Sequence, residues 1–288
     1  MRTISFYSNK GGATRTTSVF NISAVLAKNY GAKVLVIDTD PQANLTMRYM
    51  SYKTLENGGS YAWIDGISTI EDCFLAPQRM RKAVVEDAIQ KCMFPTKNGE
   101  EPSYHNIDII CTRNKDMSET TLSNVEQTIS TGSISKDVLS KVLNEVGDYD
   151  YVLIDMDSSI GPLNQMSLES SDYVVTPVHV DPNSKDGIPS FSTFFSERKS
   201  VNNHLEHLGF YSVRVNGNDS YAKELTAELE GLLGSNLFDT YTKEASQANW
   251  SLDNGIPLCW YEPGCQIAKN YVSLTKEILY RIEQKEEN

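Results

Sequence analysis

Short apolar segments rich in β-branched residues alternate along the chain with longer stretches that mix apolar and polar positions. Strands that are buried on both faces have such near-continuous apolar runs, and the longer stretches can form the crossover helices that join parallel strands. The pattern therefore predicts an α/β fold, a mostly parallel twisted sheet with helices on both faces. The predicted strands cover residues 4–8, 33–37, 107–111, 151–154, 173–178 and 210–215.

Helical spacing of apolar residues is clearest near the two ends of the chain. Val19, Ile22 and Leu26 recur at this spacing, which predicts a helix over residues 16–29 that packs on the first strand. A strand, a loop and a helix thus follow in the order that a phosphate-binding site needs. A last helix over residues 267–284 is predicted from Tyr271, Leu274, Ile278 and Ile282 on one face.

Two segments lack such periodicity and predict surface loops. Residues 51–66 are rich in glycine and aromatic residues, and residues 94–106 form a polar turn cluster. Neither is a convincing linker and no internal repeat is visible, so we expect a single domain over residues 1–288. For the 51–66 loop, contact with a partner or nucleotide and a surface insertion without function are both open.

The segment NNHLEHL predicts a helix that carries His204 and His207 three residues apart. Two histidines at this spacing can present two metal ligands, but no third ligand lies nearby in sequence. We therefore interpret them as surface residues of a helix.

The amino-acid composition excludes several classes of protein. The chain has 26 Lys and Arg against 38 Asp and Glu, a net charge of −12, which argues against a general polyanion binder. Neither a bilayer-spanning apolar run nor a signal peptide is recognisable, so we expect a cytoplasmic protein. The odd number of cysteines and the absence of a C-x-x-C pair indicate reduced thiols. They are Cys73, Cys92, Cys111, Cys259 and Cys265.

The most informative chemistry follows the first predicted strand, where residues 9–17 read NKGGATRTT. Glycines let backbone N–H groups turn toward phosphates, a lysine reaches the outer phosphates, and a hydroxyl holds Mg²⁺. The strict pattern G-x-x-x-x-G-K-[ST] is broken at Asn9, Thr14 and Arg15. On this segment alone, a nucleotide site and a plain glycine-rich turn are both open.

Four ordered motifs resemble those of the ParA/MinD family of partition and positioning ATPases, which have a deviant Walker A loop. KGGATRTT resembles K-G-G-x-G-K-T-T, and KVLVIDTDPQANLT is similar to the second motif, V-L-x-I-D-x-D-P-Q-x-N. DYDYVLIDMDSS resembles the Walker B strand, and residues 244–279 resemble the C-terminal section. The resemblance spans essentially the whole chain and implies a P-loop NTPase fold of the deviant Walker type, with ATP and Mg²⁺ as cofactors.

The resemblance also implies roles for individual residues. Lys10 matches the signature lysine that reaches the partner's nucleotide across a dimer interface, and Asp40 matches the carboxylate that positions the attacking water; these two form the implied catalytic set. The implied metal-site residues are Thr16, Asp38, Asp40 and Asp155. The implied nucleotide-binding residues are Lys10, Gly11, Gly12, Ala13, Thr14, Arg15, Thr16 and Thr17.

Three departures bear on activity. Thr14 and Arg15 stand where the family has Gly-Lys, and that lysine carries the main charge on the β- and γ-phosphates. Arginine is a wider planar group, and threonine is β-branched, so hydrolysis should suffer more than binding. Asp157 adds a carboxylate near the expected metal, where it could strengthen cation binding or repel phosphates.

The resemblance implies a homodimer, a centromere-binding, ParB-like partner protein and a role in plasmid or mobile-element DNA partition. Non-specific DNA binding would place the protein at the nucleoid, but basic residues are few. Small clusters at Arg79, Arg81 and Lys82 and at Arg198 and Lys199 could form a patch after folding, but they fit solvated charged faces better.

Two other branches of the family fit poorly. The acidic C-terminal LYRIEQKEEN opposes anionic lipid, which argues against a membrane role of the MinD type. Cys73, Cys92 and Cys111 are not placed for the iron–sulfur cluster of nitrogenase-iron-protein relatives. The leading hypothesis is therefore a ParA-like, nucleotide-dependent dimerisation switch. The alternative is a non-catalytic scaffold that keeps the fold and dimer surface without nucleotide turnover.

Overall fold

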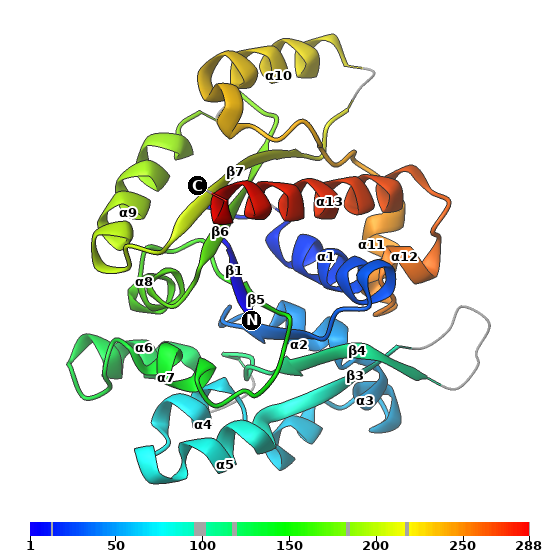
Figure 1. Ribbon diagram of the computed structural model, residues 1–288. Coiled ribbons are helices and arrows are strands. Elements are labelled where there is room, and N and C mark those ends of the chain that lie inside the picture. The colour runs from blue at the N-terminus through cyan, green and yellow to red at the C-terminus, as the bar shows by residue number, and fades with distance from the viewer. Residues whose placement is uncertain (13, 95–101, 117–119, 183–184, 217–218, 288) are drawn as a thin grey trace.

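A seven-stranded sheet with the strand order β3-β4-β2-β5-β1-β6-β7 runs through the centre of the molecule (Figure 1). β3 pairs antiparallel with β4, and the other pairings in this sheet are parallel. The computed structural model describes residues 1–12, 14–94, 102–116, 120–182, 185–216 and 219–287. The strands are β1 (Arg2–Phe6), β2 (Val34–Asp38), β3 (Ile89–Phe94), β4 (Ser103–Ile110), β5 (Tyr151–Asp155), β6 (Tyr173–His179) and β7 (Glu206–Val213).

Helices cover both faces of this sheet (Figure 1). One face packs against α1, α2, α12 and α13, and the other against α4 to α10. The first group and its neighbours are α1 (Arg15–Tyr30), α2 (Asn44–Tyr49), α3 (Ser51–Glu56), η1 (Ala62–Gly66), α11 (Ser246–Asp253), α12 (Leu258–Tyr261) and α13 (Gln266–Glu286). The second group is α4 (Ile70–Leu75), α5 (Gln78–Ala88), α6 (Leu122–Ser130), α7 (Val138–Leu143), α8 (Pro162–Glu169), α9 (Gly187–Val201), α10 (Ser220–Leu233) and η2 (Gly234–Asn236).

The strands β2 and β5 are apolar up to their final aspartates because both sides of the sheet are buried there. In β5, Leu153 packs into the core on the α1 side, whereas Val152 and Ile154 pack into the core on the other side. Alternation of side chains across the pleat puts consecutive apolar residues into different cores. This confirms the predicted α/β fold with a mostly parallel sheet and helices on both faces.

The edge strand β3 was not predicted from the sequence. Its segment IQKCMF carries polar residues, and Lys91 is exposed whereas Cys92 and Phe94 are buried. An antiparallel edge strand that faces solvent on one side has this mixed pattern, in contrast to the buried parallel strands. Of the predicted 94–106 loop, residues 95–101 lie outside the described part of the chain, and β4 begins at Ser103.

The prediction of an irregular loop over residues 51–66 was wrong, since the segment forms α3 and η1. Its aromatic residues Tyr52, Tyr61 and Trp63 pack against the core on the α1 side, and the Trp63 indole N–H donates to Thr54 Oγ1 at 3.0 Å. The aromatic residues therefore anchor two short helical turns that are too brief to show a helical period.

The predicted helix over NNHLEHL was also wrong. Helix α9 ends at Val201, and Glu206 begins β7, so His204 is exposed in the turn and His207 is half-buried in a strand. The ring of His207 lies among Phe191, Phe195 and Phe210, at centroid distances of 4.7, 5.6 and 4.7 Å. The two histidines are thus not arranged as a pair of metal ligands.

The carboxyl ends of the parallel strands β1, β2 and β5 meet at one edge of the sheet. Asp155, the last residue of β5, pairs in register with Phe6 of β1 on one side and with Asp38 of β2 on the other. In open α/β sheets, ligands bind beside the carboxyl ends of the strands. The loop between β1 and α1 leaves the sheet at this edge.

Candidate functional site

The loop between β1 and α1 contains the predicted phosphate-binding residues. Gly11 and Gly12 are exposed, and Gly12 has a φ of 73°, which glycine adopts without strain. Thr16 and Thr17 lie in the first turn of α1, a helix of 16 residues whose N-terminus carries partial positive charge. Ala13 lies outside the described residues. The loop and helix are therefore placed as a phosphate site requires.

Thr14 holds a backbone conformation that suits glycine. Its φ and ψ are 58° and 23°, in the left-handed region, where a β-branched residue is strained. Its hydroxyl is buried, has no hydrogen-bonding partner in the described part of the chain and does not cap α1. The backbone here has the conformation that a glycine would take, although the side chain is a threonine.

The Arg15 side chain turns back onto its own loop. One Nη1 donates to the carbonyl oxygens of Ser8 and of Lys10, the latter at 3.2 Å. Its charge also lowers the pKa of both Asp40 and Asp155, although burial outweighs that effect. The guanidinium therefore contacts the loop backbone and also lies near the carboxylates of Asp40 and Asp155.

The last residue of β6 and a residue just after this strand hold the other side of the loop. The Lys10 ammonium forms an ion pair with Asp181, and the His179 Nε2–H donates to the Gly12 carbonyl at 2.7 Å. Neither His179 nor Asp181 was among the predicted site residues. Their position directly after a predicted strand, at the edge where the other site residues gather, is the sequence signal that could have found them.

Asp38 and Asp155 are fully buried side by side at the ends of β2 and β5. The oxygens of Asp38 accept hydrogen bonds from the Asp40 N–H at 3.1 Å and from the Thr46 N–H and hydroxyl, both at 2.8 Å. Burial, then the charges of Asp155 and Asp40, raise the pKa of Asp38 well above its ordinary value. Asp38 thus fixes the start of the Asp40 loop, which we define as residues 38–46.

Asp155 differs from Asp38 in that neither of its oxygens has a hydrogen-bonding partner among the described residues. Burial and then the charge of Asp40 raise the pKa of Asp155 to about 7, against a smaller effect of the nearby Thr16 hydroxyl. A buried carboxylate without a donor is costly, so this position calls for a cation or ordered water.

The remaining predicted carboxylates lie around Asp155. Asp40 is 8% exposed and accepts from the Gln42 N–H at 2.9 Å, and burial raises its pKa. Asp157 accepts from the Ser159 N–H at 2.8 Å and from the Asn164 amide, which anchors the turn before α8. Its charge raises the pKa of Asp40 and Asp155.

Within the described ranges, no three His, Cys, Asp or Glu side chains are grouped to hold a metal ion by themselves. Mg²⁺ commonly binds through one or two carboxylates together with waters and substrate phosphates. The arrangement of Thr16, Asp40 and Asp155 fits that mode better than an all-protein cage.

Two pockets border the loop. One of about 460 Å³ is lined in part by Lys10, His179 and Phe210, and one of about 260 Å³ by Thr14, Arg214 and Tyr271. Arg214 has a φ of 55°, so both Thr14 and Arg214, on the smaller pocket, are non-glycine residues in the left-handed region. Such strain clusters at functional sites.

The two predicted basic clusters do not join. Arg79, Arg81 and Lys82 lie on α5, which is far from α9 with Arg198 and Lys199 (Figure 1). Arg198 Nη1 donates to Glu169 at 2.6 Å, and Lys199 forms an ion pair with Glu206. The pair on α9 is therefore neutralised by its neighbours.

Among the described residues, no helix combines the length and apolarity that a bilayer crossing requires. All five cysteines are free thiols, four of them buried.

Known proteins with similar sequences cover nearly the whole chain. A ParA family protein of Chlamydia pneumoniae is 26% identical over 285 residues, which cover 97% of this chain and 98% of the relative. The chromosome-partitioning ATPase Soj of Treponema pallidum is 24% identical over 282 residues, which cover 97% and 98%.

Solved structures share the fold. A variant of Cyanothece McdA in complex with ATP has a TM-score of 0.75 at 19% identity and covers 97% of this chain and 96% of its own. A putative plasmid partition protein of Borrelia burgdorferi bound to AMPPNP has a TM-score of 0.69 at 21% identity, with 99% of both chains covered. The family model AAA_31, described as an AAA domain, matches residues 1–207. Because this match takes in well over half of the 288 residues, the chain belongs to the AAA_31 family, among the ParA-like P-loop ATPases.

Proposed function

We propose that this protein is a ParA-like switch that binds ATP with Mg²⁺ between two copies of the chain and controls its dimerisation through the nucleotide state. The observation that carries the proposal is Asp155, whose two buried oxygens have no hydrogen-bonding partner in the described structure and lie beside the glycine-rich loop. A cation brought in with a nucleotide would satisfy them.

The residues around Asp155 fit Mg²⁺. The Thr16 hydroxyl and the carboxylates of Asp40 and Asp155 are oxygen donors of the kind that Mg²⁺ prefers, and Asp38 orients Asp40 through its N–H. Bound Mg²⁺ would neutralise phosphate charge. Asp40, which keeps a small exposed surface, would then hold and orient a water molecule.

The loop would supply the phosphate contacts. The amides of Gly11 and Gly12 and the N-terminus of α1 favour an anion, and Thr14 already holds the glycine-like backbone conformation. Arg15 would exchange the Ser8 and Lys10 carbonyls for phosphate oxygens and keep its positive charge. The smaller pocket beside Thr14 and Thr17 would receive the rest of the nucleotide.

Lys10 would act across a homodimer. Its side chain is 41% exposed and is held by a partly exposed carboxylate, so it can leave Asp181 and reach a second subunit. The relatives named for chromosome partitioning support a role in plasmid or mobile-element DNA partition or positioning, with a centromere-binding, ParB-like partner protein. Non-specific DNA binding has weak support from charge.

A second candidate function is a non-catalytic scaffold that keeps the fold and the dimer surface. The contacts of Arg15 with its own loop favour it, because a guanidinium that satisfies loop carbonyls leaves no mobile ammonium for the γ-phosphate. In this alternative the double change Thr14→Gly and Arg15→Lys would create nucleotide binding that the native protein lacks.

Isothermal titration with ATP and with a slowly hydrolysed analogue, each with and without Mg²⁺, tests the proposal. We expect Mg²⁺-dependent binding that Asp155→Asn abolishes and that the exposed control Asp253→Asn leaves intact. In the same way, Lys10→Ala should reduce ATP-dependent dimerisation, whereas Lys141→Ala, another partly exposed ion-paired lysine, should not. Absence of heat at millimolar ATP, with binding restored by the double change, would establish the scaffold instead.

A further inference from the structure

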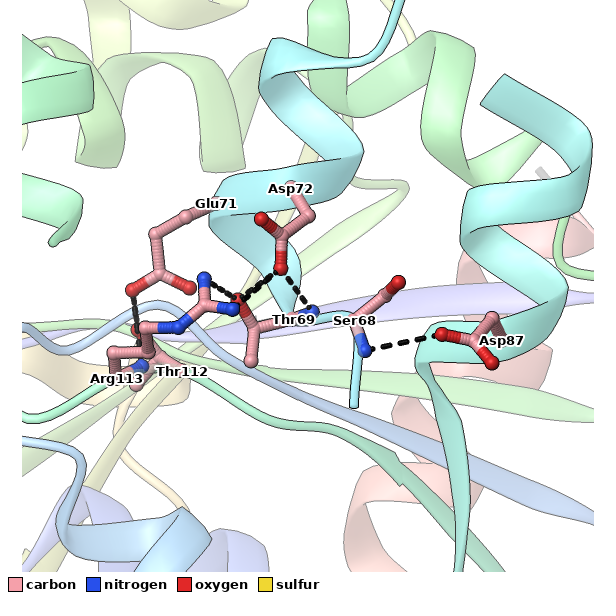
Figure 2. A network of polar contacts seen from close by, with 7 residues as sticks. All are labelled: Ser68, Thr69, Glu71, Asp72, Asp87, Thr112 and Arg113. Carbon is pink, nitrogen blue, oxygen red and sulfur yellow. Dashed lines mark hydrogen bonds and ion pairs between the residues drawn. The ribbon is translucent and has the colours of Figure 1, made fainter. Parts of the chain in front are cut away.

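A further buried carboxyl group, that of Glu71, lies outside the site described above. Glu71, in α4, has 0% exposure, and its hydrogen bonds go to Thr112 and Arg113. Figure 2 shows it beside the segment that follows β4, together with Thr112 and Arg113. Since burial of a carboxylate costs free energy, its presence here calls for a reason.

Glu71 holds this segment by two contacts from one oxygen. Oε1 accepts from the Thr112 hydroxyl at 2.7 Å and from the Arg113 N–H at 3.0 Å (Figure 2). The Arg113 guanidinium turns away to the Thr69 hydroxyl at 2.6 Å and to Asp72 at 2.8 Å. Glu71 therefore acts on the segment's backbone and on Thr112, while Asp72 takes the arginine charge.

The segment held by Glu71 continues into the nucleotide site. The Thr112 N–H donates to Thr46 Oγ1 at 3.0 Å, and the Thr46 hydroxyl donates to Asp38 at 2.8 Å. Asp38 in turn accepts from the Asp40 N–H. Thr112 and Thr46 are both fully buried, so these bonds form one continuous chain shielded from water.

A second set of contacts joins the same two segments further along. The Asn114 side-chain amide donates to the Gln42 carbonyl at 2.8 Å, and the Lys115 N–H donates to the Pro41 carbonyl at 3.0 Å. The Asp40 loop is thus attached at three points to residues 112–115, and Glu71 fixes the start of that segment.

We propose that Glu71 is a positioning residue for the Asp40 loop: it holds Thr112 and the Arg113 backbone, and through Thr46 and Asp38 it sets where Asp40 lies. The effect on the loop is independent of any ligand. Its consequence for Mg²⁺-dependent nucleotide binding rests on the function proposed above.

The first test is amide hydrogen exchange over residues 38–46 in the nucleotide-free protein. Glu71→Met keeps the bulk and removes the acceptor, and Thr112→Val removes one donor with little change of shape. Since each buried hydrogen bond lost weakens the chain, exchange of the Asp40 loop should accelerate about fivefold relative to amides of α13. Asp72→Asn, on the same helix, is the matched control and should leave that ratio unchanged.

Thr112→Val tests the same chain of hydrogen bonds independently, in case the Glu71→Met variant misfolds. An unchanged ratio in both variants, or an equal acceleration by Asp72→Asn, would overturn the proposal. As a second test, Glu71→Met should raise the Mg²⁺ concentration for half-maximal ATP binding about fivefold and leave Mg²⁺-free ATP binding as it was. If the native protein binds no ATP, the proposed function fails, whereas the exchange experiment still decides the role of Glu71.

Discussion

Lys10 and Asp181 form an ion pair that joins the glycine-rich loop to the segment after β6. The side chains are 41% and 32% exposed, and a pair this open to water contributes at most about 1 kcal/mol. In the proposed dimer, a contact this weak would let Lys10 leave Asp181 for a phosphate.

Asp181→Asn should strengthen ATP-dependent dimerisation by up to about fivefold, because Lys10 no longer has to leave a carboxylate. Sedimentation in the presence of ATP and Mg²⁺ measures the dimer fraction. Asp137→Asn, which breaks the Lys141–Asp137 pair on α7, is the control and should change nothing. A weaker dimer in Asp181→Asn would mean that Asp181 supports the interface directly.

Thr14→Gly should raise the free energy of unfolding by about 1 kcal/mol. A threonine in the left-handed region is strained by about 1–2 kcal/mol, and the change also removes a buried hydroxyl without a partner. The greater freedom of glycine in the unfolded chain offsets part of this gain.

Urea unfolding of the Thr14→Gly variant makes the measurement, with Thr17→Gly as its control. Thr17 lies in the first turn of α1, where glycine should lower the free energy of unfolding by up to about 1 kcal/mol. A loss of stability in Thr14→Gly would show that the threonine side chain supports the loop.

The sequence predicts the sheet well where strands are buried on both faces, because a run such as that at 151–154 has no other stable environment. The sequence-based prediction fails where tertiary contacts determine the local structure. The mixed polarity of β3 reflects an edge position, and His207 is in a strand because aromatic side chains enclose it.

The sequence predicts those residues of the candidate site that lie within recognisable motifs. Lys10, Asp40 and Asp155 gather at one edge of the sheet, as their positions after strands imply. Asp181 and Glu71 belong to no motif, since a single Asp or Glu is common in turns and helices. Their contacts with Lys10 and Thr112 span 171 and 41 residues, so the fold alone brings them together.

Asp155→Asn should stabilise the protein in the absence of divalent cations. The buried carboxylate has no hydrogen-bonding partner among the residues that the structure describes and lies near the charge of Asp40. The amide keeps the shape of the side chain without its charge. We expect a gain of about 1–3 kcal/mol in the free energy of unfolding at pH 8 in chelator. Thermal unfolding checks this, with Asp253→Asn as the exposed control. Equal or lower stability would indicate that buried water already satisfies Asp155.

His207 should make the free energy of unfolding fall at acid pH, and a single substitution should remove this dependence. Burial lowers the pKa of His207 to about 3, whereas an unfolded histidine titrates near 6.5. Between these values the unfolded chain binds one more proton than the folded protein. This group's contribution to stability is therefore present above pH 6.5 and is lost as the pH falls, by up to about 1.4 kcal/mol per pH unit.

His207→Gln should flatten the dependence of the free energy of unfolding on pH between 6 and 5, even though lost packing against Phe191 and Phe210 lowers stability overall. The slope, measured by urea unfolding at several pH values, is the readout, because packing losses are the same at each pH. His204→Gln removes an exposed histidine three residues away and should keep the native slope. An unchanged slope in His207→Gln would mean that His207 is protonated in the folded protein, against the apolar surroundings that enclose it.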